Sequence, residues 1–420
     1  MPVNYLAPDI YIEEVPLGTR PIQAVGTSTA GFVGATPDKA AHLNEAVAIP
    51  NWTEFIRQFV PNGSLSTPLS HAVRGFFDNG GTLCYVCNTG DGPIIGTGTQ
   101  RVGLDVLATI DEIAIVAAPG QYGADVYDAL LTHCETLQDR VCILDTPRDV
   151  NDLNQLTQVA TASAPSTPAS TKKKSGDTPD AAGGDATTPP AAPTGGLRPR
   201  QSDNGFGAVY FPWITVRDAL TGGIVDVAPS GHLAGIWARS DATRGVHKAP
   251  ANEIIRGALN VTRRLTRDEQ GILNPQGVNA IRLFSGEGVR VMGARTVAAG
   301  SSEYRYLNVR RLFCMVEESI DQSMRWVLFE PNSMPLWKSI ERDVTAFLIR
   351  LWRDGALFGA TADQAFFVKC DAETNPQENI DAGIVTTVIG MAPVKPAEFV
   401  IFRISQFVGG TEVEALGGNK

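Results

Sequence analysis

The chain has 420 residues, of which 43% are hydrophobic and 19% are charged, and its formal net charge is −10. This length suffices for two or three domains with separate cores, while the acidic balance argues against a general nucleic-acid-binding protein. Its apolar runs are too short for a membrane-spanning helix, which needs about 18 residues. The six cysteines include Cys84-x-x-Cys87 but no second pair to complete a zinc site, so we expect reduced, buried thiols and no metal or cofactor.

The first 25 residues are expected to be extended, because prolines at positions 2, 8, 16 and 21 exclude a long helix. Between these prolines, DIYIEEV alternates apolar and polar residues and predicts a short strand. The start of the chain lacks the basic and apolar regions of a secretory signal, so we expect synthesis and folding in the cytoplasm.

An alternation of strands and helices follows from about residue 26 to residue 150. The predicted strands are TAGFVGA, TLCYVCN, EIAIVAAP and RVCILDTP, and the predicted helices are NWTEFIRQFV, PLSHAVRGFFDNGG and ADVYDALLTHCETL. This order is typical of an α/β domain. Residues 161–200 then contain one leucine and no aromatic residue. Such a segment buries too little apolar surface to offset the entropy of ordering it, so we expect a mobile surface insertion.

The fold is expected to resume at VYFPWITV and to enter a second α/β region from about residue 230. In that region we predict helices at VRRLFCMVEESI and PLWKSIERDVTAFLIRLWRDG, and strands at WVLFEP, AFFVKCD, GIVTTVIGMAP and EFVIFRISQF. The sequence therefore predicts a two-domain α/β (α+β) protein with divisions near residues 25, 230 and 397. The last of these strands is apolar on both faces, and an unpaired strand of that kind invites association.

We find no catalytic constellation in the sequence. It has five histidines and no HExxH, GxSxG or Walker A motif. The turn CDAETNPQENID gathers Asp371, Glu373, Glu378 and Asp381, which leaves a metal-dependent hydrolase using residues 371–381 as an alternative hypothesis. Ordinary Asx and proline turn chemistry explains these residues more simply, so we predict that the protein is not an enzyme.

A set of motifs spread along the chain resembles the tail sheath protein family. The motifs are YIEEV (11–15), TAGFVG (29–34), AVRGFFDNGG (72–81), RGVHKAPAN (244–252), LTRDEQGILNPQGVNAIRLF (265–284), GARTV (293–297), YRYLNVRRLFCMVEESI (304–320), FEPN (329–332), FFVKCDAETNP (366–376) and APVKPAEFVIFRI (392–404). That family comprises the sheaths of contractile phage tails, R-type pyocins and extracellular contractile injection systems. The low-complexity insertion at 161–200 departs from its core pattern.

The resemblance implies a structural protein whose copies stack as rings around an inner tube. A baseplate signal triggers contraction, and the tube is driven through a target envelope. The implied partners are further copies of the chain, the inner tube protein, and baseplate and terminal cap proteins, with no nucleic-acid binding and no membrane insertion. The implied location is the bacterial cytoplasm, followed by assembly into a phage tail or a phage-tail-like particle that leaves the cell. A static self-assembling filament remains an alternative.

The resemblance also suggests a role for each part of the chain. Residues 26–230 would form an outer α/β domain, residues 231–397 a core sheath domain with a mixed sheet near the tube, and residues 1–25 and 398–420 arms that add strands to a neighbour's sheet. The candidate arm contacts are Tyr11, Ile12, Val15, Phe399, Val400, Ile401, Phe402 and Ile404. The alternative that both strands pair within their own chain stays open at this point.

The helix predicted from residue 335 to residue 354 is the candidate contact with the inner tube. Its apolar stripe is expected to be buried, which leaves a basic side toward solvent or toward the tube, made of Lys338, Arg342, Arg350 and Arg353. A solvated charged face with no partner is the alternative interpretation.

Overall fold

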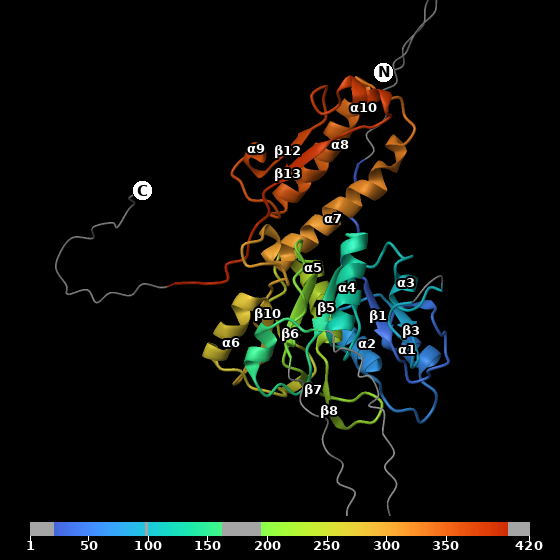
Figure 1. The fold of residues 1–420 in the computed structure, drawn as a ribbon, viewed down its shortest axis with the longest axis vertical. Coiled ribbons are helices and arrows are strands. Elements are labelled where there is room, and N and C mark those ends of the chain that lie inside the picture. The colour runs from blue at the N-terminus through green and yellow to red at the C-terminus, as the bar shows by residue number, and fades with distance from the viewer. Residues whose placement is uncertain (1–20, 97–99, 162–194, 402–420) are drawn as a thin grey trace, which may run out of the picture.

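A computed structural model of the chain describes residues 21–96, 100–161 and 195–401. The predicted strand DIYIEEV, most of the predicted insertion and residues 402–407 of the last predicted strand lie outside the described residues. Within the described part, Figure 1 shows two bodies joined by one long helix, α7 (Leu307–Met324). The first body is built on a large sheet, and the second, smaller body contains the helices and the strand pair that follow α7.

The sheet of the first body has eight strands. In spatial order they are β11 (Gly288–Val291), β10 (Val278–Phe284), β6 (Gly207–Phe211), β5 (Val141–Asp145), β4 (Ile115–Ala117), β1 (Ala30–Gly34), β3 (Cys84–Asn88) and β2 (Ala46–Ile49). The six inner strands run parallel, and the two edge strands β2 and β11 are antiparallel to their neighbours. Parallel strands are covered on both faces, which explains why the strands predicted from residues 26–150 are continuous apolar runs.

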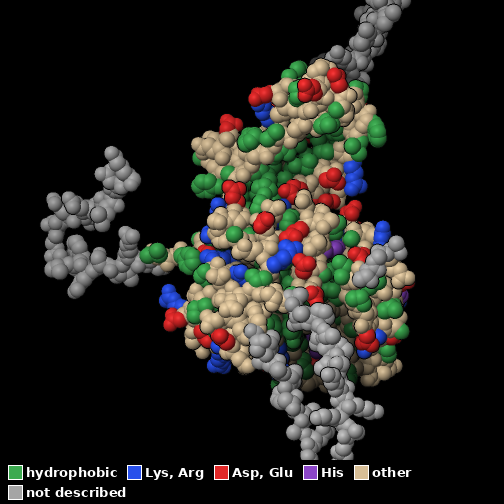
Figure 2. Space-filling model, in the orientation of Figure 1, with side chains coloured by type: hydrophobic (Ala, Val, Ile, Leu, Met, Phe, Trp, Pro, Cys, Tyr) green, Lys and Arg blue, Asp and Glu red, His purple; other side chains and the backbone are tan. Residues whose placement is uncertain are grey.

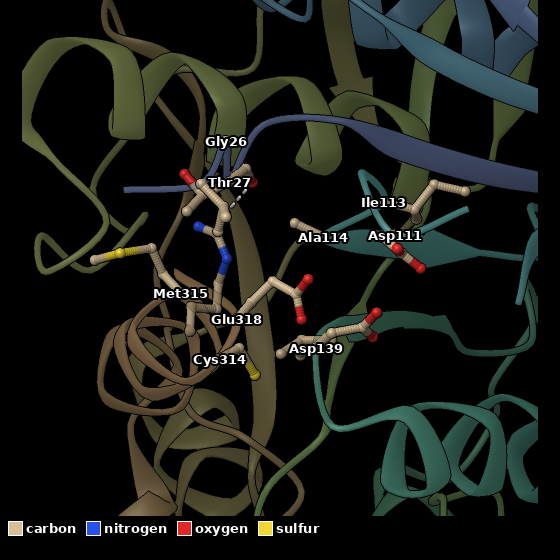
Figure 3. Close-up of a pocket in the computed structure, with 12 residues that line it drawn as sticks. Gly26, Thr27, Asp111, Ile113, Ala114, Asp139, Cys314, Met315 and Glu318 are labelled. Atoms are coloured by element: carbon tan, nitrogen blue, oxygen red, sulfur yellow. Dashed lines mark hydrogen bonds between the residues drawn. The ribbon is translucent and has the colours of Figure 1, made fainter. Parts of the chain in front are cut away.

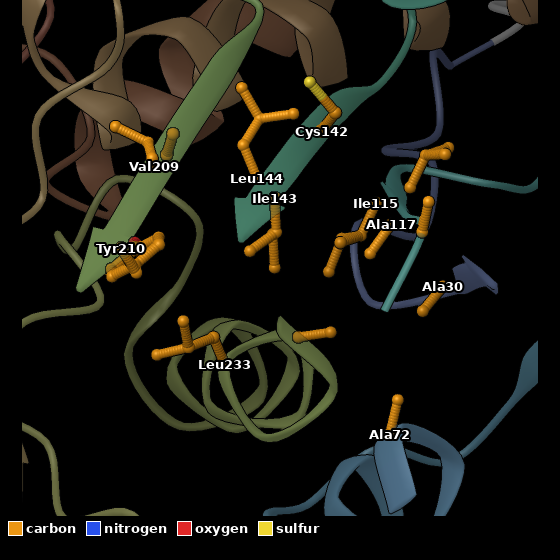
Figure 4. Packing of buried hydrophobic residues seen from close by; sticks show 14 of the residues in the cluster. Ala30, Ala72, Ile115, Ala117, Cys142, Ile143, Leu144, Val209, Tyr210 and Leu233 are labelled. Carbon is orange, nitrogen blue, oxygen red and sulfur yellow. The ribbon is translucent and has the colours of Figure 1, made fainter. Parts of the chain in front are cut away.

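Helices cover both faces of this sheet. On one face, α2 (Pro68–Asp78) packs against α5 (Ser230–Arg244), and Figure 4 shows Ile143 of β5 pointing toward Leu233 of α5. On the other face lies α4 (Ala124–Leu137), because a side chain at Gly207 would meet Leu131 of α4 beside Cys142 and Leu144. The alternation of side chains along β5 therefore separates the two helical layers.

The remaining elements of the first body are short. The helices are α1 (Trp52–Phe59), α3 (Leu104–Leu107) and α6 (Arg267–Leu273), with 3₁₀ turns η1 (Leu153–Thr157), η2 (Asn274–Gln276) and η3 (Glu303–Arg305). A three-stranded antiparallel sheet is formed by β8 (Ile224–Val227), β7 (Ile214–Arg217) and β9 (Ala258–Val261).

The second body packs around α8 (Met334–Arg353), whose predicted apolar stripe is buried. It also contains α9 (Ala362–Ala365), α10 (Gln377–Asp381) and the antiparallel pair β12 (Phe366–Lys369) and β13 (Val388–Met391). The predicted mixed α/β class is confirmed, and all six cysteines are buried free thiols, as the sequence predicts.

Three details of the sequence interpretation are corrected by the structure. WVLFEP is not a strand: it contains the 3₁₀ turn η4 (Arg325–Val327), after which Phe329 is fully exposed with a φ of 67°. The predicted insertion is too wide, because Leu197 is buried and Arg200 forms ion pairs with Asp128 and Glu135 of α4. The expected division at residue 230 also does not coincide with a division in the core.

The core divides within α7. One hydrophobic cluster extends from β1 through β10 to Leu307 and Cys314, because β10 pairs with β6 and α5 packs on α2. A second cluster includes Leu312 of α7 and the α8 stripe, together with Ile22 and Val246 from earlier in the chain. Both bodies therefore share α7, which contributes Leu307 and Cys314 to one core and Leu312, Met315 and Val316 to the other.

Candidate assembly interfaces

The place where a doubly wound sheet usually binds a ligand is filled in this chain. Strand order reverses between β1 and β4, and ligands bind at the carboxyl ends of strands on either side of such a reversal. Here α2 begins at that point: Leu69 and Gln121 lie within van der Waals distance of a side chain placed on Gly34, and Pro68 lies against Gly120. The sheet edge thus serves as a packing surface for α2.

The acidic turn after β12 is held together by its own hydrogen bonds. The Asp371 carboxylate accepts the backbone N–H groups of Glu373 and Thr374, at 2.9 and 3.2 Å, and these bonds hold the pKa of Asp371 below its usual value. Asn375 donates to the carbonyl oxygens of Asp371 and Thr386, both at 3.1 Å. Turn chemistry thus accounts for Asp371. In the three ranges that the structure describes, no group of three His, Cys, Asp or Glu residues is arranged to hold a metal ion.

The described chain begins with a segment that lies on the second body. Ile22 is fully buried there, and Arg350 of α8 donates a hydrogen bond to its carbonyl oxygen. The backbone N–H of Val25 donates to Ser319 Oγ of α7 at 3.0 Å. The segment therefore runs along α7 before it enters β1.

The same segment then crosses the junction between the bodies, where it is hydrogen-bonded to a buried ion pair. Arg311 of α7 bonds both carboxylate oxygens of Asp241 of α5, at 3.0 and 2.5 Å, and also donates to the Thr27 carbonyl oxygen at 2.9 Å. Figure 3 shows the adjoining crevice, with Asp111 and Asp139 on the first body and Glu318 on α7. Burial, together with these two carboxylates, raises the pKa of Glu318.

The end of the described chain is held on the first body by Glu398. Its carboxylate accepts two hydrogen bonds from Arg295, at 2.9 and 2.8 Å, one from Asn274 Nδ2 at 2.7 Å and one from Tyr306 Oη at 3.0 Å. The next three residues, Phe399, Val400 and Ile401, have exposed fractions of 71, 68 and 79%. The chain therefore leaves its own surface directly after Glu398, with apolar side chains in solvent.

Exposed apolar side chains also gather over the strand pair β12–β13. Figure 2 shows a hydrophobic region over these strands, and the exposed large apolar residues near them are Phe358, Phe367, Ile384 and Val388. A groove of about 500 Å³ lies between α7 and residues 391–395. In the described part of the chain, β12 and β13 pair only with each other, so both outer edges of this small sheet are open.

The four basic residues predicted to face the tube are all exposed, but they differ in their contacts. Lys338 pairs with Glu341 at 2.6 Å, and Arg342 pairs with Asp343, a buried carboxylate, at 3.0 Å. Arg350 binds Ile22 as described above. Two of the four basic side chains of α8 therefore contact buried groups of their own subunit. Lys338 and Arg353 have no such contact among the interactions described above.

The structure brings together residues that the sequence interpretation did not select. Phe399, Val400 and Ile401 are described and exposed, whereas Tyr11, Ile12, Val15, Phe402 and Ile404 lie outside the described residues. The Glu398–Arg295 and Arg311–Asp241 pairs were not predicted. Glu398, Arg295 and Arg311 lie in the family motifs, which could have marked them as candidates, whereas Asp241 does not. Apolar periodicity gives no information about such charged residues.

Comparison with known proteins gives matches to the same family by sequence and by fold. The phage tail sheath protein central domain matches residues 201–297, and the phage tail sheath C-terminal domain matches residues 300–407. The sheath of the PVC extracellular contractile injection system, solved in its contracted state, superposes with a TM-score of 0.72 at 28% identity over 97% of this chain and 99% of its own. The chain belongs to the contractile tail sheath family.

Further relatives differ in how much of their length they share with this sheath protein. The contracted helical sheath of the anti-feeding prophage (AFP) superposes with a TM-score of 0.69 at 29% identity over 96% of this chain and 100% of its own. The tail sheath protein of Salmonella phage ViI is 29% identical over 49% of this chain and 33% of its own length. The matched region spans about a quarter to a half of the length of such curated phage relatives.

Membership of this family answers whether the chain is an enzyme. Its members are structural sheath proteins and not enzymes, which confirms the prediction that the chain is not an enzyme. In the described ranges, no helix is long and apolar enough to cross a membrane.

Proposed function

We propose that this chain is the repeating subunit of a contractile sheath, in which stacked rings surround an inner tube and shorten to drive it through a target envelope. The observation that carries the proposal is the end-to-end match to the contracted PVC sheath, which covers 97% of this chain and 99% of the other. Curated phage relatives match over only part of their length, which favours an extracellular contractile injection system over a phage tail.

The proposed partners are further copies of the chain, an inner tube protein, and baseplate and terminal cap proteins. Support comes from relatives solved as a helical sheath and within a baseplate of the anti-feeding prophage. The proposal includes synthesis in the bacterial cytoplasm and assembly into a particle that acts outside the cell. It includes neither nucleic-acid binding nor membrane insertion.

We further propose that the arms predicted at residues 1–25 and 398–420 are exchanged beyond the points where Ile22 and Glu398 are bound to their own subunit. There they would complete the β12–β13 sheet of neighbouring copies. A two-stranded sheet is marginally stable by itself, and its open edges are templates for another strand. Three apolar residues beyond Glu398 stand in solvent, and an apolar region covers the strand pair. Strand addition would bury both surfaces at once.

The energetics explain why such an arm must be apolar. Each ladder hydrogen bond contributes roughly 0.5–1.5 kcal/mol net, whereas ordering each residue costs about 1–2 kcal/mol of backbone entropy. Hydrogen bonds alone are therefore insufficient. Each buried large apolar side chain adds roughly 1.5–3 kcal/mol, so Phe399, Val400 and Ile401, together with Phe402 and Ile404, tip the balance toward association.

The second body is our candidate for the part nearest the tube, with α8 as the contact. Exposed ion pairs contribute only about 0–1 kcal/mol each and are screened by salt. Contacts of this strength, repeated along the tube, suit a sheath that must release the tube when it contracts. Each subunit would move as a nearly rigid body between two packings while the arms keep the lattice connected.

The arm proposal is tested by deleting residues 399–420, or by Phe402→Asp with Ile404→Asp, in the full chain. We expect a soluble, folded subunit that no longer polymerises, as seen by negative-stain microscopy and sedimentation. The matched control is Leu65→Asp with Leu259→Asp, which places the same charges at exposed apolar positions of the first body. Sheaths of normal length from the arm variants would refute the exchanged-strand assignment.

A further inference from the structure

The Glu398 carboxylate lies in a built site on the first body. The donors come from three places in the chain: Asn274 after α6, Arg295 after β11, and Tyr306 before α7. The Arg295 side chain is 11% exposed and that of Glu398 is 19% exposed. We call these four residues the arm clamp.

The chemistry of the arm clamp is that of a strong, directional anchor. Arg295 donates a hydrogen bond to each carboxylate oxygen of Glu398, and this two-point geometry fixes the orientation of the carboxylate as well as its position. Burial favours the neutral carboxyl, but the four donated hydrogen bonds outweigh it and lower the pKa of Glu398. Arg305 stacks over the Tyr306 ring at 4.6 Å and donates to its hydroxyl at 2.8 Å, which holds that ring in place.

The chain between β13 and the arm clamp crosses from the second body to the first without turning back. The backbone N–H of Ala392 donates to Ala365 at 2.9 Å, that of Val394 donates to Ala356 at 3.2 Å, and Asn308 donates to the Val394 carbonyl oxygen at 3.0 Å. Pro393 and Pro396 restrict the backbone further. The segment is thus tied to the protein at Ala392, Val394 and Glu398.

This path bears on which sheet the apolar arm can reach. A hairpin between the arm and β13 of the same copy would need residues 392–398 as its loop, and they would have to leave both bodies. A tethered strand has an effective concentration of about millimolar for a site within reach. A subunit with a free tether would therefore occupy its own sheet before a neighbour at lower concentration does.

We infer that the arm clamp is a positioning site that keeps the C-terminal arm from pairing with its own β12–β13 sheet, so that the arm is available only to a second copy. This inference rests on the proposed exchange of arms. Glu398 contacts no partner in this role: it acts by holding the root of the strand that does.

The test uses Glu398→Ala and Glu398→Gln in the full chain, because the carboxylate lies near the end of the described chain and its loss leaves both cores intact. The control is Glu287→Ala, which removes the more exposed carboxylate bonded to Arg290. We expect a lower unfolding midpoint in a subunit that is still folded at the assay temperature, because Arg295 loses its carboxylate partner. We also expect about a tenfold or greater rise in the critical concentration for polymerisation with Glu398→Ala, a smaller rise with Glu398→Gln, and none with the control.

Amide hydrogen exchange of the soluble subunit separates the possible causes. In Glu398→Ala, the amides of β12 and β13 should exchange more slowly than in the same variant truncated after residue 398, because the freed arm covers them. Normal polymerisation of Glu398→Ala, while the 399–420 deletion fails to polymerise, would overturn the arm clamp alone. If Glu398→Ala polymerises poorly but its β12 and β13 amides exchange as fast as in the truncated variant, the arm does not pair with its own sheet and the inference is wrong. Normal polymerisation of the deletion would instead refute the exchanged arm itself.

Discussion

Arg311 and Asp241 form a two-point ion pair between α7 and α5, with side chains that are only 3 and 5% exposed. The Arg311 guanidinium also lies over the Trp237 ring, 4.9 Å from its centre. The pair stands where the core divides, close to the segment that leads into β1. It joins the second body to the first and supports the treatment of the subunit as one rigid unit during contraction.

Asp241→Asn should destabilise the subunit strongly, because it leaves the buried Arg311 charge without its partner. Removing one member of a buried pair typically costs about 3–5 kcal/mol. The free energy of unfolding from urea titration measures the effect. The control is Asp91→Asn, whose exposed pair with Lys39 should contribute at most about 1 kcal/mol. Equal losses for the two variants would show that the junction is not held by this pair.

Direct joining of residue 161 to residue 195 should leave folding and assembly intact. A side chain on Gly195 would lie 3.7 Å from Thr161 Oγ1, so the two ends already meet. Removal of the whole range 161–200 should instead destabilise the subunit, because it takes away buried Leu197 and the Arg200 ion pairs with α4. Thermal unfolding and microscopy of both variants show which boundary of the insertion is correct. Equal behaviour of the two variants would contradict the narrower boundary taken from the structure.

Lys338→Glu with Arg353→Glu should yield sheath that assembles poorly on the tube or contracts early, while the monomer remains folded. Charge reversal at Arg342 or Arg350 would be a less specific test, because it would also break their contacts within the subunit. Arg342 pairs with Asp343, and Arg350 donates a hydrogen bond to the Ile22 carbonyl oxygen. The matched control is Lys39→Glu on the first body. If extended particles of the double variant form normally and resist salt like the unmodified sheath, α8 is not the tube contact.

Acid should destabilise the isolated subunit through its buried imidazoles. Burial lowers the pKa of His133 to about 4, helped by Arg140, and lowers that of His232 to about 4, helped by His71. Because the unfolded state then binds more protons between about pH 4 and 6.5, stability falls as pH falls through this window.

His133→Gln removes one of these contributions without touching the other. It should reduce the loss of unfolding free energy between pH 7 and pH 5 by about 2 kcal/mol, measured by urea titration at both values. The control is His42→Gln at an exposed position. An unchanged pH dependence in His133→Gln would show that this imidazole protonates freely in the folded subunit.

Local patterns in the sequence predicted much of this fold. The buried parallel strands are continuous apolar runs, and the α8 stripe repeats at helical spacing, so both were correctly assigned. Periodicity carries no information on which strands pair, and for that reason the pairing of β10 with β6 across the expected boundary was missed. WVLFEP has the composition of a strand, but Phe329 lies in a turn with its side chain in solvent.

The interfaces were less predictable for a physical reason. A pattern of apolar residues shows that Phe399, Val400 and Ile401 need a partner, but not where the chain leaves its own body. That point depends on Glu398 meeting Asn274, Arg295 and Tyr306, which are 92 to 124 residues away in sequence. Contacts of such separation between charged and polar side chains leave no periodic trace.

Negative-stain microscopy of native particles, before and after a contraction trigger such as mild denaturant, tests the central claim most directly. A contractile sheath should appear as long, thin particles that become short and wide, with the inner tube protruding from the contracted form. Filaments that keep a single width and length under every condition would contradict the account and identify the protein as a static self-assembling filament.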